Sequence, residues 1–508
     1  MKVLLVLPVL VPMATAALTL LAFRREGIQR GLGLAGSVVQ LVVGAVLLRA
    51  VYRGGIPSTQ VGSWPWPYGI TFVADTFSAL MVLLSAIIAV ATSIYALSDI
   101  DQERRTHGFY PLMHVLLMGT NGVFVTGDFF NLYVWFEVTL IASFVLLVLG
   151  NERPQMQGAI KYVAMNLISS ALFLTGIGIL YGSVHALNMA DLSLKLPTLA
   201  APIRTTLAMI FLVAFGIKAA VFPLFFWLPD SYHTPPVTIT ALFAGLLTKV
   251  GVYALVRVFT LLFVSDRDST HALLLGIAGF TMAVGVLGAV SHREVRRILA
   301  FHSVSQVGYM VMGLGLFTMA SLAGAIFFVL HHALIKSNLF LISGIMHPHG
   351  KEVRLDREGG LLARKPALSA CFLVTALSLA GLPPLSGFWA KLLLVRSGLE
   401  VGSQRAAAVV ATSLVVGLVT LISMTKIWNE AFWKPAPAET DLAAQPNGTR
   451  PRVFLYVPVV LLTSLGVTLG FSPDPLLQIV QRAAAQLADP TEYVHAVLGD
   501  RAHETPRP

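Results

Sequence analysis

A series of apolar stretches, each about 20 residues long, runs through almost the whole chain, with only short polar segments between them. A helix needs a stretch of this length to cross the hydrocarbon core of a bilayer. We place about fourteen of them, at roughly 3–23, 31–51, 70–97, 109–127, 129–149, 158–182, 205–228, 236–262, 272–291, 297–317, 321–346, 366–397, 405–432 and 453–471. The sequence therefore predicts an all-α polytopic membrane protein with about 14 transmembrane helices.

The composition supports the membrane class and argues against other classes. Only 12% of the residues are charged, whereas a soluble domain carries roughly 25%. The formal net charge is +10, but the Lys and Arg residues lie mostly in short loops, where they encode membrane topology rather than nucleic-acid binding. The single cysteine, Cys371, excludes an intrachain disulfide and a thiolate metal cluster.

The distribution of basic residues predicts the orientation. An even number of spans places both termini on one side of the membrane, and about twice as many Lys and Arg residues lie in the loops on the opposite side. Basic loops stay in the cytoplasm, so we expect a multi-pass protein of the cell membrane with both termini outside. The first stretch continues up to Arg24 and is expected to be an uncleaved span. The tail from Pro473 is expected to form a short amphipathic helix on the outer surface.

Two of the predicted spans carry helix breakers near their centres. One contains Pro223, and the other contains Gly381, Pro383, Pro384 and Gly387. A proline inside a helix removes a hydrogen bond and kinks or breaks the helix. Unwound backbone at membrane depth is tolerated only where protein buries it or where it lines a wet cavity. Two interrupted spans about five spans apart therefore indicate a repeated transporter architecture, with proline kinks that only shape helix packing as the alternative.

Five charged residues lie near the middle of apolar stretches: Glu137, Lys218, Lys249, Lys336 and Lys391. Each costs about 2.5–3.5 kcal/mol near the bilayer centre on insertion scales, and such residues mark ion or proton pathways. Asp128 is expected to cap the helix that contains Glu137. Glu137 then lies about 14 Å into a core about 30 Å thick, close to the midplane.

Lys218 lies about one helical turn before Pro223 and is a candidate ion-pair partner of Glu137. Burial disfavours the charged form of a lysine, whereas a nearby carboxylate favours it. A pair that forms and separates would switch the lysine between holding and releasing a proton; a permanent structural pair is the alternative. Lys249 is interpreted as the next station, because it lies too far from the ends of its span for its ammonium to reach the interface.

His331, His332 and Lys336 share one predicted span. His332 and Lys336 are four residues apart and so lie on the same face of a helix. Histidine titrates near neutral pH, which suits a proton relay; hydrogen bonding between helices is the alternative. No HExxH motif and no carboxylate lies within helical reach, so no metal is predicted.

Lys391 follows the second break and is the last buried cation before the outer side, which makes it the expected exit station. A polar stripe of His302, Ser305 and Gln306 either lines a water path or hydrogen-bonds between helices, and both interpretations stay open. Asp75 is expected to cap its helix.

At these residues the chain resembles the antiporter-like membrane subunits shared by respiratory complex I and the multi-subunit Mrp-type Na+/H+ antiporters. The matching segments are 128–137, 216–230, 246–251, 331–341 and 381–391. Within that family it is most similar to the D subunits of the Mrp type, on the segments 4–12, 133–137 and 158–171.

The resemblance implies two inverted five-helix repeats around a hydrated polar axis, with Glu137 and Lys218 as the ion pair, Lys249 as the central lysine and Lys391 as the terminal lysine. It divides the chain into an N-terminal three-helix segment, a first repeat, a second repeat, and a final part with a cytoplasmic loop, the last helix and the tail. These parts cover residues 1–108, 109–262, 263–432 and 433–508.

The expected function is proton translocation within a multi-subunit Na+(cation)/H+ antiporter, without a cofactor, a metal or covalent chemistry. The expected partners are the other subunits of an Mrp-type complex, H+, Na+ and membrane lipid, but not nucleic acid. The alternative is a proton-pumping membrane subunit of complex I or of a membrane-bound hydrogenase. A third hypothesis, a scaffold that carries no ion, predicts that the buried charges are dispensable.

Overall fold

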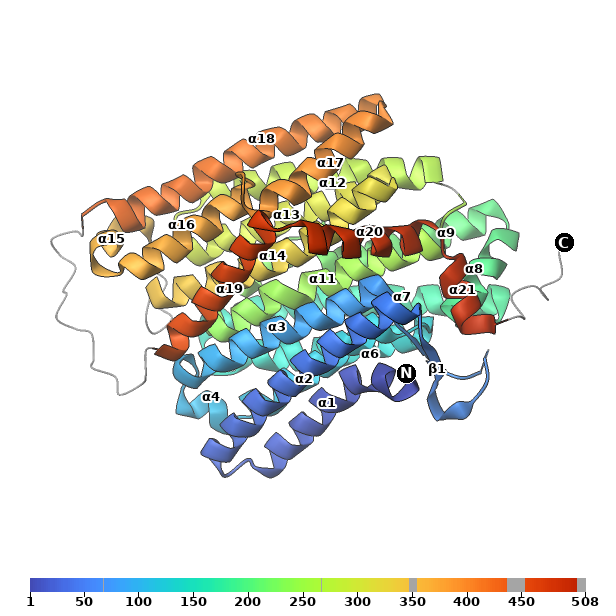
Figure 1. Cartoon of the computed structure of the whole chain (residues 1–508), viewed down its shortest axis with the longest axis horizontal. Helices are drawn as coiled ribbons and strands as arrows, with labels where there is room; N and C mark the ends of the chain where they lie inside the picture. Colours follow the sequence, from blue (N-terminus) through green and yellow to red (C-terminus); the bar gives the residue numbers. More distant parts are fainter. Residues whose placement is uncertain (67, 266, 347–353, 436–452, 500–508) are drawn as a thin grey trace.

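The computed structural model describes residues 1–66, 68–265, 267–346, 354–435 and 453–499. Long helices lie side by side with their axes running in broadly the same direction (Figure 1). The helices of the predicted spans are α1 (Lys2–Leu21), α2 (Glu26–Gly54), α3 (Thr76–Asp99), α5 (Phe109–Val125), α6 (Phe129–Val148), α7 (Arg153–Val184), α9 (Ala201–Ala219), α10 (Trp227–Tyr232), α11 (Val237–Leu261), α12 (Arg267–Ser291), α13 (Val295–Leu316), α14 (Met319–Met346), α16 (Pro366–Ala380), α17 (Ser386–Val401), α18 (Gln404–Ile427) and α19 (Val453–Phe471).

The predicted count of about fourteen spans agrees with this structure. In the described part of the chain, twelve helices are long and apolar enough to cross a membrane. The two remaining predicted spans correspond to α5, which has 17 residues, and to the pair α16 and α17. Asp75 and Asp128 cap α3 and α6 as expected, accepting hydrogen bonds from the backbone N–H groups of Ser78 and Asn131.

Both predicted breaks lie where the sequence places them. The chain leaves helical geometry between α9 and α10, around Pro223, and again between α16 and α17, from Gly381 to Leu385. Gly381 has a φ of +92°, a conformation that only glycine adopts easily. In each run of five spans that starts at α5 and at α12, the broken span is the fourth.

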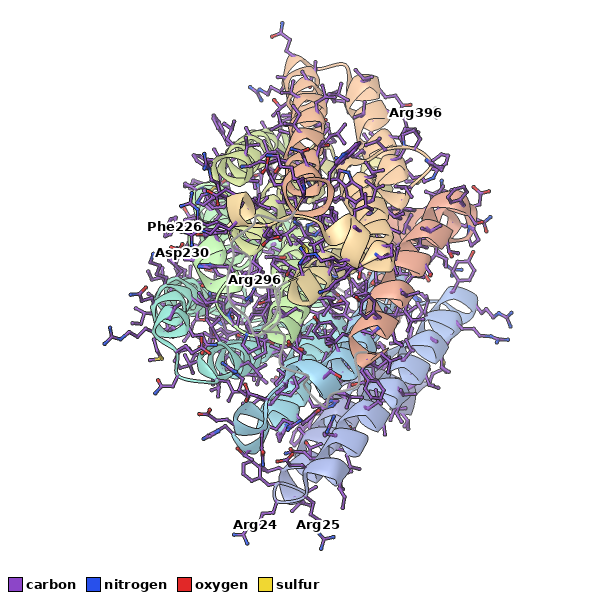
Figure 2. All side chains as sticks on the ribbon, turned by 90° about the vertical axis from the view of Figure 1, so that its left-hand side faces the viewer. Arg24, Arg25, Phe226, Asp230, Arg296 and Arg396 are labelled. Carbon is purple, nitrogen blue, oxygen red and sulfur yellow. The ribbon has the colours of Figure 1, made fainter. Side chains whose placement is uncertain are left out.

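The loops rich in Lys and Arg meet at one end of the helices. Glu294 forms a β-bridge with Arg354, and the Gly360 N–H donates to the Lys434 carbonyl at 2.5 Å. Figure 2 looks onto this end, where Arg24 and Arg25 project away from the body of the protein.

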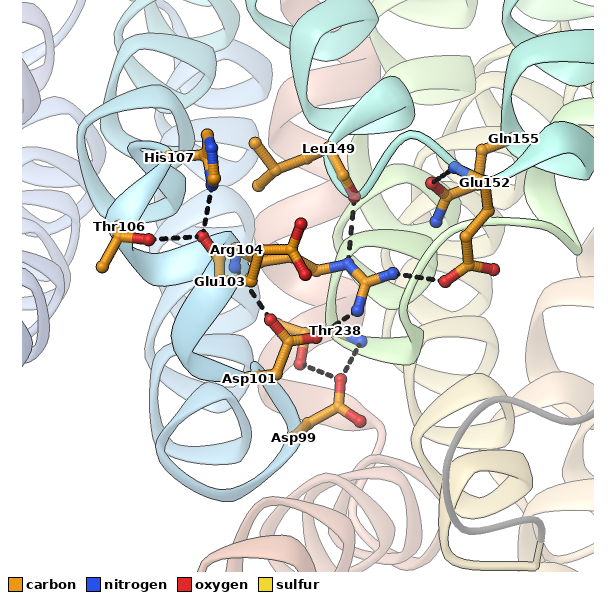
Figure 3. Close-up of polar contacts among 10 residues, drawn as sticks. All are labelled: Asp99, Asp101, Glu103, Arg104, Thr106, His107, Leu149, Glu152, Gln155 and Thr238. Atoms are coloured by element: carbon orange, nitrogen blue, oxygen red, sulfur yellow. Dashed lines mark hydrogen bonds and ion pairs between the residues drawn. The ribbon is translucent and has the colours of Figure 1, made fainter.

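At the same end, Arg104 joins two loops (Figure 3). It lies on the short helix α4 (Gln102–Thr106) and donates to the Leu149 carbonyl at 3.0 Å and to Glu152 at 2.6 Å. Beside it, the Asp99 carboxylate accepts from the backbone N–H of Thr238 at 3.0 Å and from its hydroxyl at 2.7 Å. The end of α3 and the start of α11 are therefore held together.

The opposite end carries the short elements that sequence analysis did not predict. The strands β1 (Ser58–Gln60) and β2 (Thr71–Val73) pair antiparallel there. Beside them lie α8 (Met189–Lys195) and α21 (Thr491–Leu498), near the start of α1 (Figure 1). Asn188 donates to the Thr71 hydroxyl at 2.8 Å, and Ser58 donates to the Ala496 carbonyl at 2.5 Å.

The predicted amphipathic tail helix exists as α20 (Asp474–Ala488), but it lies against the bundle. Gly470, at the end of α19, approaches the backbone of the second break, and its carbonyl accepts from the Trp389 indole at 2.8 Å. From there α20 packs along α14 and α3, which bury Val480 and Leu487 completely or nearly so. The apolar face of α20 therefore packs against protein and not against the membrane surface.

Gly251 sets how closely α11 approaches the first break. A Cβ atom built on Gly251 would lie 2.6 Å from the carbonyl carbon of Lys218 and 2.4 Å from the backbone N of Ala219. These contacts are with backbone atoms, which cannot rotate away as a side chain can.

We predict that Gly251→Leu lowers the free energy of unfolding by about 1–3 kcal/mol, the usual cost of overpacking. Gly276→Leu on α12 is the control, because a Cβ atom there has no neighbour within 4 Å. Thermal unfolding in detergent measures both. Equal melting temperatures for the two variants would contradict the close approach of α11 to this break.

Candidate functional site

The centre of the protein is formed by α11 and α14, which other helices enclose. The apolar part of each is completely buried inside the structure. Lys249 on α11 and Lys336 on α14 are both fully buried. Their charges therefore face protein and not lipid.

Glu137 lies on α6 at one side of this centre, where it is partly buried. Its carboxylate accepts a hydrogen bond from the Ser170 hydroxyl of α7. Lys218 lies within electrostatic range of Glu137, but the described residues contain no direct ion pair between them. The predicted partners are thus neighbours that are not in contact.

Lys218 lies in the last turn of α9, immediately before the break. The unpaired carbonyl groups at a helix C-terminus favour a positive charge there. The ammonium is 5.7 Å from the ring centroid of Phe136, the neighbour of Glu137 in the chain. It also lines a small cavity with Asn166, Tyr162 and Leu247, large enough for about one water molecule.

Lys249 and Lys336 lie within electrostatic range of each other and have no acidic partner in the described structure. Lys249 donates to the Ala244 carbonyl of its own helix. Lys336 donates to the Leu299 carbonyl of α13 at 2.8 Å. Backbone carbonyl groups therefore solvate both ammonium groups in place of carboxylates.

We call the side chains of Lys218, Lys249, Lys336, His332, His331 and Lys391 the row. Within it, His332 lies on α14 about one turn before Lys336. Lys249, Lys336, His331 and His302 all act on His332 electrostatically. Neither of its ring nitrogens has a hydrogen-bond partner among the described residues, although both are buried. His331 Nδ1 is 2.8 Å from the Ser386 hydroxyl at the start of α17, while its Nε2 is buried without a partner in the described chain.

The polar side chains of the stripe on α13 differ in their hydrogen-bond partners. His302 Nε2 is 2.9 Å from the Ser423 hydroxyl of α18, and both amide atoms of Gln306 are buried with no partner in the part of the chain described. Ser305 instead donates to the Met282 carbonyl of α12 at 2.9 Å. His302 and Ser305 therefore both join α13 to neighbouring helices, and His302 also lies within electrostatic range of Lys336 and Lys391.

Lys391 lies at the second break. Its ammonium donates to the carbonyls of Ala380 at 2.7 Å and Leu379 at 3.3 Å, at the end of α16. No N–H group of a following helical turn uses these carbonyls, because the helix stops at Ala380. The ammonium also lies 4.9 Å from the ring centroid of Tyr309 on α13. The break thus supplies the acceptors that solvate this lysine.

A second feature of the site is a set of buried polar atoms without hydrogen-bond partners among the described residues. Near the buried lysines they include atoms of Thr248, His302, Gln306, His331 and His332, and atoms of this kind also occur elsewhere in the described structure, for example on Gln40 and Tyr110. Buried polar groups are almost always hydrogen-bonded, to ordered water if not to protein. These atoms are therefore candidate positions for ordered water beside the buried Lys and His side chains.

Of the seven residues that the sequence placed in the pathway, the structure brings five within electrostatic range of one another in series: Lys249, Lys336, His332, His331 and Lys391. Lys218 neighbours Glu137 and lines a cavity with Leu247 and Val250 of α11. Sequence analysis missed Ser170, Asn166 and Tyr309. Tyr309 had a signal, because it lies on the same helical face as His302 and Gln306. Ser170 and Asn166 had none, since small polar residues in apolar helices are common. No group of His, Cys, Asp or Glu in the described residues has the arrangement of a metal site.

The chain matches one protein family and is similar over nearly its full length to named members of it. Residues 126–417 match the family described as "NADH:quinone oxidoreductase/Mrp antiporter, TM". The chain is 43% identical to the D subunit of the Na(+)/H(+) antiporter of Alkalihalophilus pseudofirmus, with 98% of this chain and 100% of that protein aligned. It is 37% identical to the protein of the same name in Bacillus subtilis, over 97% and 99% of the two chains.

Among solved structures, a chain of the Mrp complex from Dietzia sp. DQ12-45-1b superposes with a TM-score of 0.88 at 33% identity, covering 97% of this chain and 99% of that one. The matched family region is more than half of the chain, and both named relatives are more than 30% identical over nearly their full length. The chain therefore belongs to the NADH:quinone oxidoreductase/Mrp antiporter family of membrane proteins.

Proposed function

We propose that this chain is the D-type subunit of a multi-subunit Na+/H+ antiporter and that it moves protons along the row from Glu137 to Lys391. The observation that carries this proposal is the row itself: buried ammonium and imidazole groups on α9, α11 and α14 and a half-buried ammonium on α17, with unpartnered polar atoms beside them in the described structure. The names of the two relatives at 43% and 37% identity support the same function.

The first step is the approach of Glu137 to Lys218. The carboxylate now accepts from Ser170 and the ammonium lies over Phe136. When the carboxylate turns to Lys218 it stabilises the ammonium, and when it returns to Ser170 that stabilisation is lost. Lys218 then passes a proton to water in the adjoining cavity, on the side of Leu247 and Val250 of α11.

The following steps rest on repulsion between like charges. Lys249 and Lys336 are close enough to act on each other, so a proton arriving at one favours its loss from the other. Both lysines act electrostatically on His332, and neither of its ring nitrogens has a hydrogen-bond partner in the described structure. It can accept a proton on one nitrogen and release one from the other.

The two alternative functions fit less well. A subunit of complex I or of a membrane-bound hydrogenase would use the same kind of row, but the relatives at 43% and 37% identity carry the antiporter name. A scaffold would not need several buried cations, each of which costs free energy to insert.

The arrangement of the breaks supports two five-span repeats, 109–262 and 263–432, after the N-terminal segment 1–108 and before the final part 433–508. An odd number of spans per repeat gives the two repeats opposite orientations. We further propose that the end with the basic loops faces the cytoplasm and that α1 starts outside, because basic loops are retained inside. The partners are the other subunits of an Mrp-type complex.

We predict that Glu137→Gln lowers Na+-dependent proton flux by at least about 100-fold, because the amide keeps a hydrogen bond from Ser170 but cannot set the charge of Lys218. The flux is measured in vesicles and divided by the amount of assembled complex. Glu400→Gln is the matched control, since Glu400 forms an exposed ion pair with Arg396 far from the row. Normal flux per complex in Glu137→Gln would favour the scaffold.

Lys391→Arg tests whether the terminal lysine releases a proton. A guanidinium keeps its positive charge at any physiological pH, so we expect antiport to fall almost as far as in Lys391→Ala. Lys161→Arg, at an exposed lysine paired with Asp230, is the control. Antiport close to that of the native complex in Lys391→Arg would assign Lys391 a fixed electrostatic role instead.

A further inference from the structure

A second cluster of buried polar groups lies outside the row, toward the end of the protein that carries α21. Its centre is an ion pair between Asp75, at the start of α3, and Arg257 of α11, with an Nη2–Oδ2 distance of 2.6 Å. The two side chains are only 1% and 5% exposed. Among the ion pairs of the described residues, no other has both partners buried this deeply.

The cluster shares a helix face with the central lysine. Lys249, Tyr253 and Arg257 follow one another at intervals of four residues on α11, so they lie along one side of that helix. The Tyr253 hydroxyl is 2.8 Å from the Ser78 hydroxyl and 3.2 Å from Arg257 Nη2. Arg257 Nη2 is also 3.3 Å from the Ser78 hydroxyl. A hydrogen-bonded chain therefore begins at Tyr253, one turn beyond Lys249, and reaches Asp75 through Arg257 and through the Ser78 backbone N–H, which donates to the carboxylate at 2.8 Å.

From Asp75 the chain of contacts continues to the surface through the C-terminal helices. The N–H of Thr76 donates to the Gln486 side chain at 3.0 Å. Gln486 in turn donates to Glu492 at 3.0 Å, and Glu492 is exposed. The Tyr493 ring covers the guanidinium of Arg257, 5.1 Å away. Together α20 and α21 cover the ion pair, at the same end as β1 (Figure 1).

Two buried atoms without partners mark places for water at the two ends of this cluster. On the side of Lys249, Ser85 donates to Asn121 at 2.5 Å, while the Asn121 amide nitrogen has no partner among the described residues. Asn121 lies about one turn deeper than Phe124, whose carbonyl accepts from Tyr253 at 3.0 Å. At the outer end, the Tyr493 hydroxyl is also buried without a partner in the described chain. Such groups are normally satisfied by ordered water.

A purely structural role explains these features poorly. A buried ion pair that only fastens helices can often be replaced by apolar side chains without loss of stability. It also does not require hydroxyl groups that lead toward a buried lysine, nor unpartnered polar atoms at each end. A buried charge at membrane depth instead marks a functional path by default.

We propose that Tyr253, Ser78 and Asp75 form a second proton outlet, which branches from the row at Lys249 and leads to the surface beneath α21, and that the Asp75–Arg257 ion pair closes it in this structure. This proposal rests on the proposed function of the row. The Lys249 ammonium gives a proton, through water at Asn121, to the Tyr253 oxygen, and the Tyr253 hydroxyl turns from the Phe124 carbonyl and passes its own proton to Ser78. Ser78 passes one to the Asp75 carboxylate after Arg257 has moved away. Asp75 releases it to outer water, and the ion pair re-forms.

Tyr253→Phe tests the outlet, because it removes the hydroxyl and keeps the ring. The complete antiporter complex is reconstituted in proteoliposomes, and Na+-dependent proton flux is divided by the amount of assembled complex. The control is Tyr95→Phe, at a buried tyrosine on α3 whose hydroxyl donates to the Leu341 carbonyl at 3.0 Å. We expect a loss of at least about tenfold for Tyr253→Phe and less than about twofold for Tyr95→Phe. Flux within about twofold of native in assembled Tyr253→Phe would overturn the outlet.

The closing role of the ion pair has its own test. Arg257→Gln removes the guanidinium that holds Asp75 and keeps the carboxylate that carries the proton. We expect proton leak without Na+ to rise at least about tenfold in the same proteoliposomes, since the closing ion pair is gone. A leak equal to that of the native complex would show that the pair does not close a proton path.

Failure of this outlet is distinguishable from failure of the proposed function. If Lys249→Ala abolishes antiport while Tyr253→Phe leaves it intact, the row conducts and the outlet lies elsewhere. If Lys249→Ala also leaves antiport intact, both the row and the outlet are wrong.

Discussion

The cost of holding a positive charge away from water constrains every part of this structure. An ammonium group at membrane depth costs several kcal/mol unless polar groups solvate it. Here α11 and α14 are enclosed by other helices, and backbone carbonyls replace water around Lys249 and Lys336. For Lys391 the acceptors exist only because α16 stops at Ala380 and leaves its last carbonyls free. The breaks are therefore part of the solvation of the charges.

These ammonium groups bond to backbone carbonyls but, among the described residues, to no carboxylate. This weaker stabilisation of the charged form is what permits proton movement. A lysine held by one carbonyl and by no carboxylate gives up its proton more easily than one in a tight ion pair. Asp75 and Arg257 show the contrast, because they form a short, buried and fully paired contact. The same protein thus keeps loosely held cations along its row and a tightly held pair beside it. The first arrangement suits transfer and the second suits closure.

The sequence predicts the fold well where one strong physical signal acts alone. Apolar length located the spans, and Pro223 and the Gly381–Pro384 cluster located both breaks, because proline and glycine act through the local backbone. Lysines in apolar stretches located the buried cations, because a charge at membrane depth costs free energy wherever it lies in the chain. The sequence did not predict that α20 packs on α14, since an amphipathic face suits a membrane surface and a protein groove equally. Nor did it pair Asp75 with Arg257, which are far apart in the chain and meet only through tertiary packing.

The central claim is that the row from Lys218 to Lys391 is hydrated and continuous. The most direct measurement is an experimental structure of the assembled complex at a resolution that shows ordered water. We expect water within hydrogen-bonding distance of both His332 ring nitrogens and the Gln306 amide, linking Lys249, Lys336 and Lys391 without a dry gap. A row in which apolar side chains fill these positions and no water reaches His332 would contradict it.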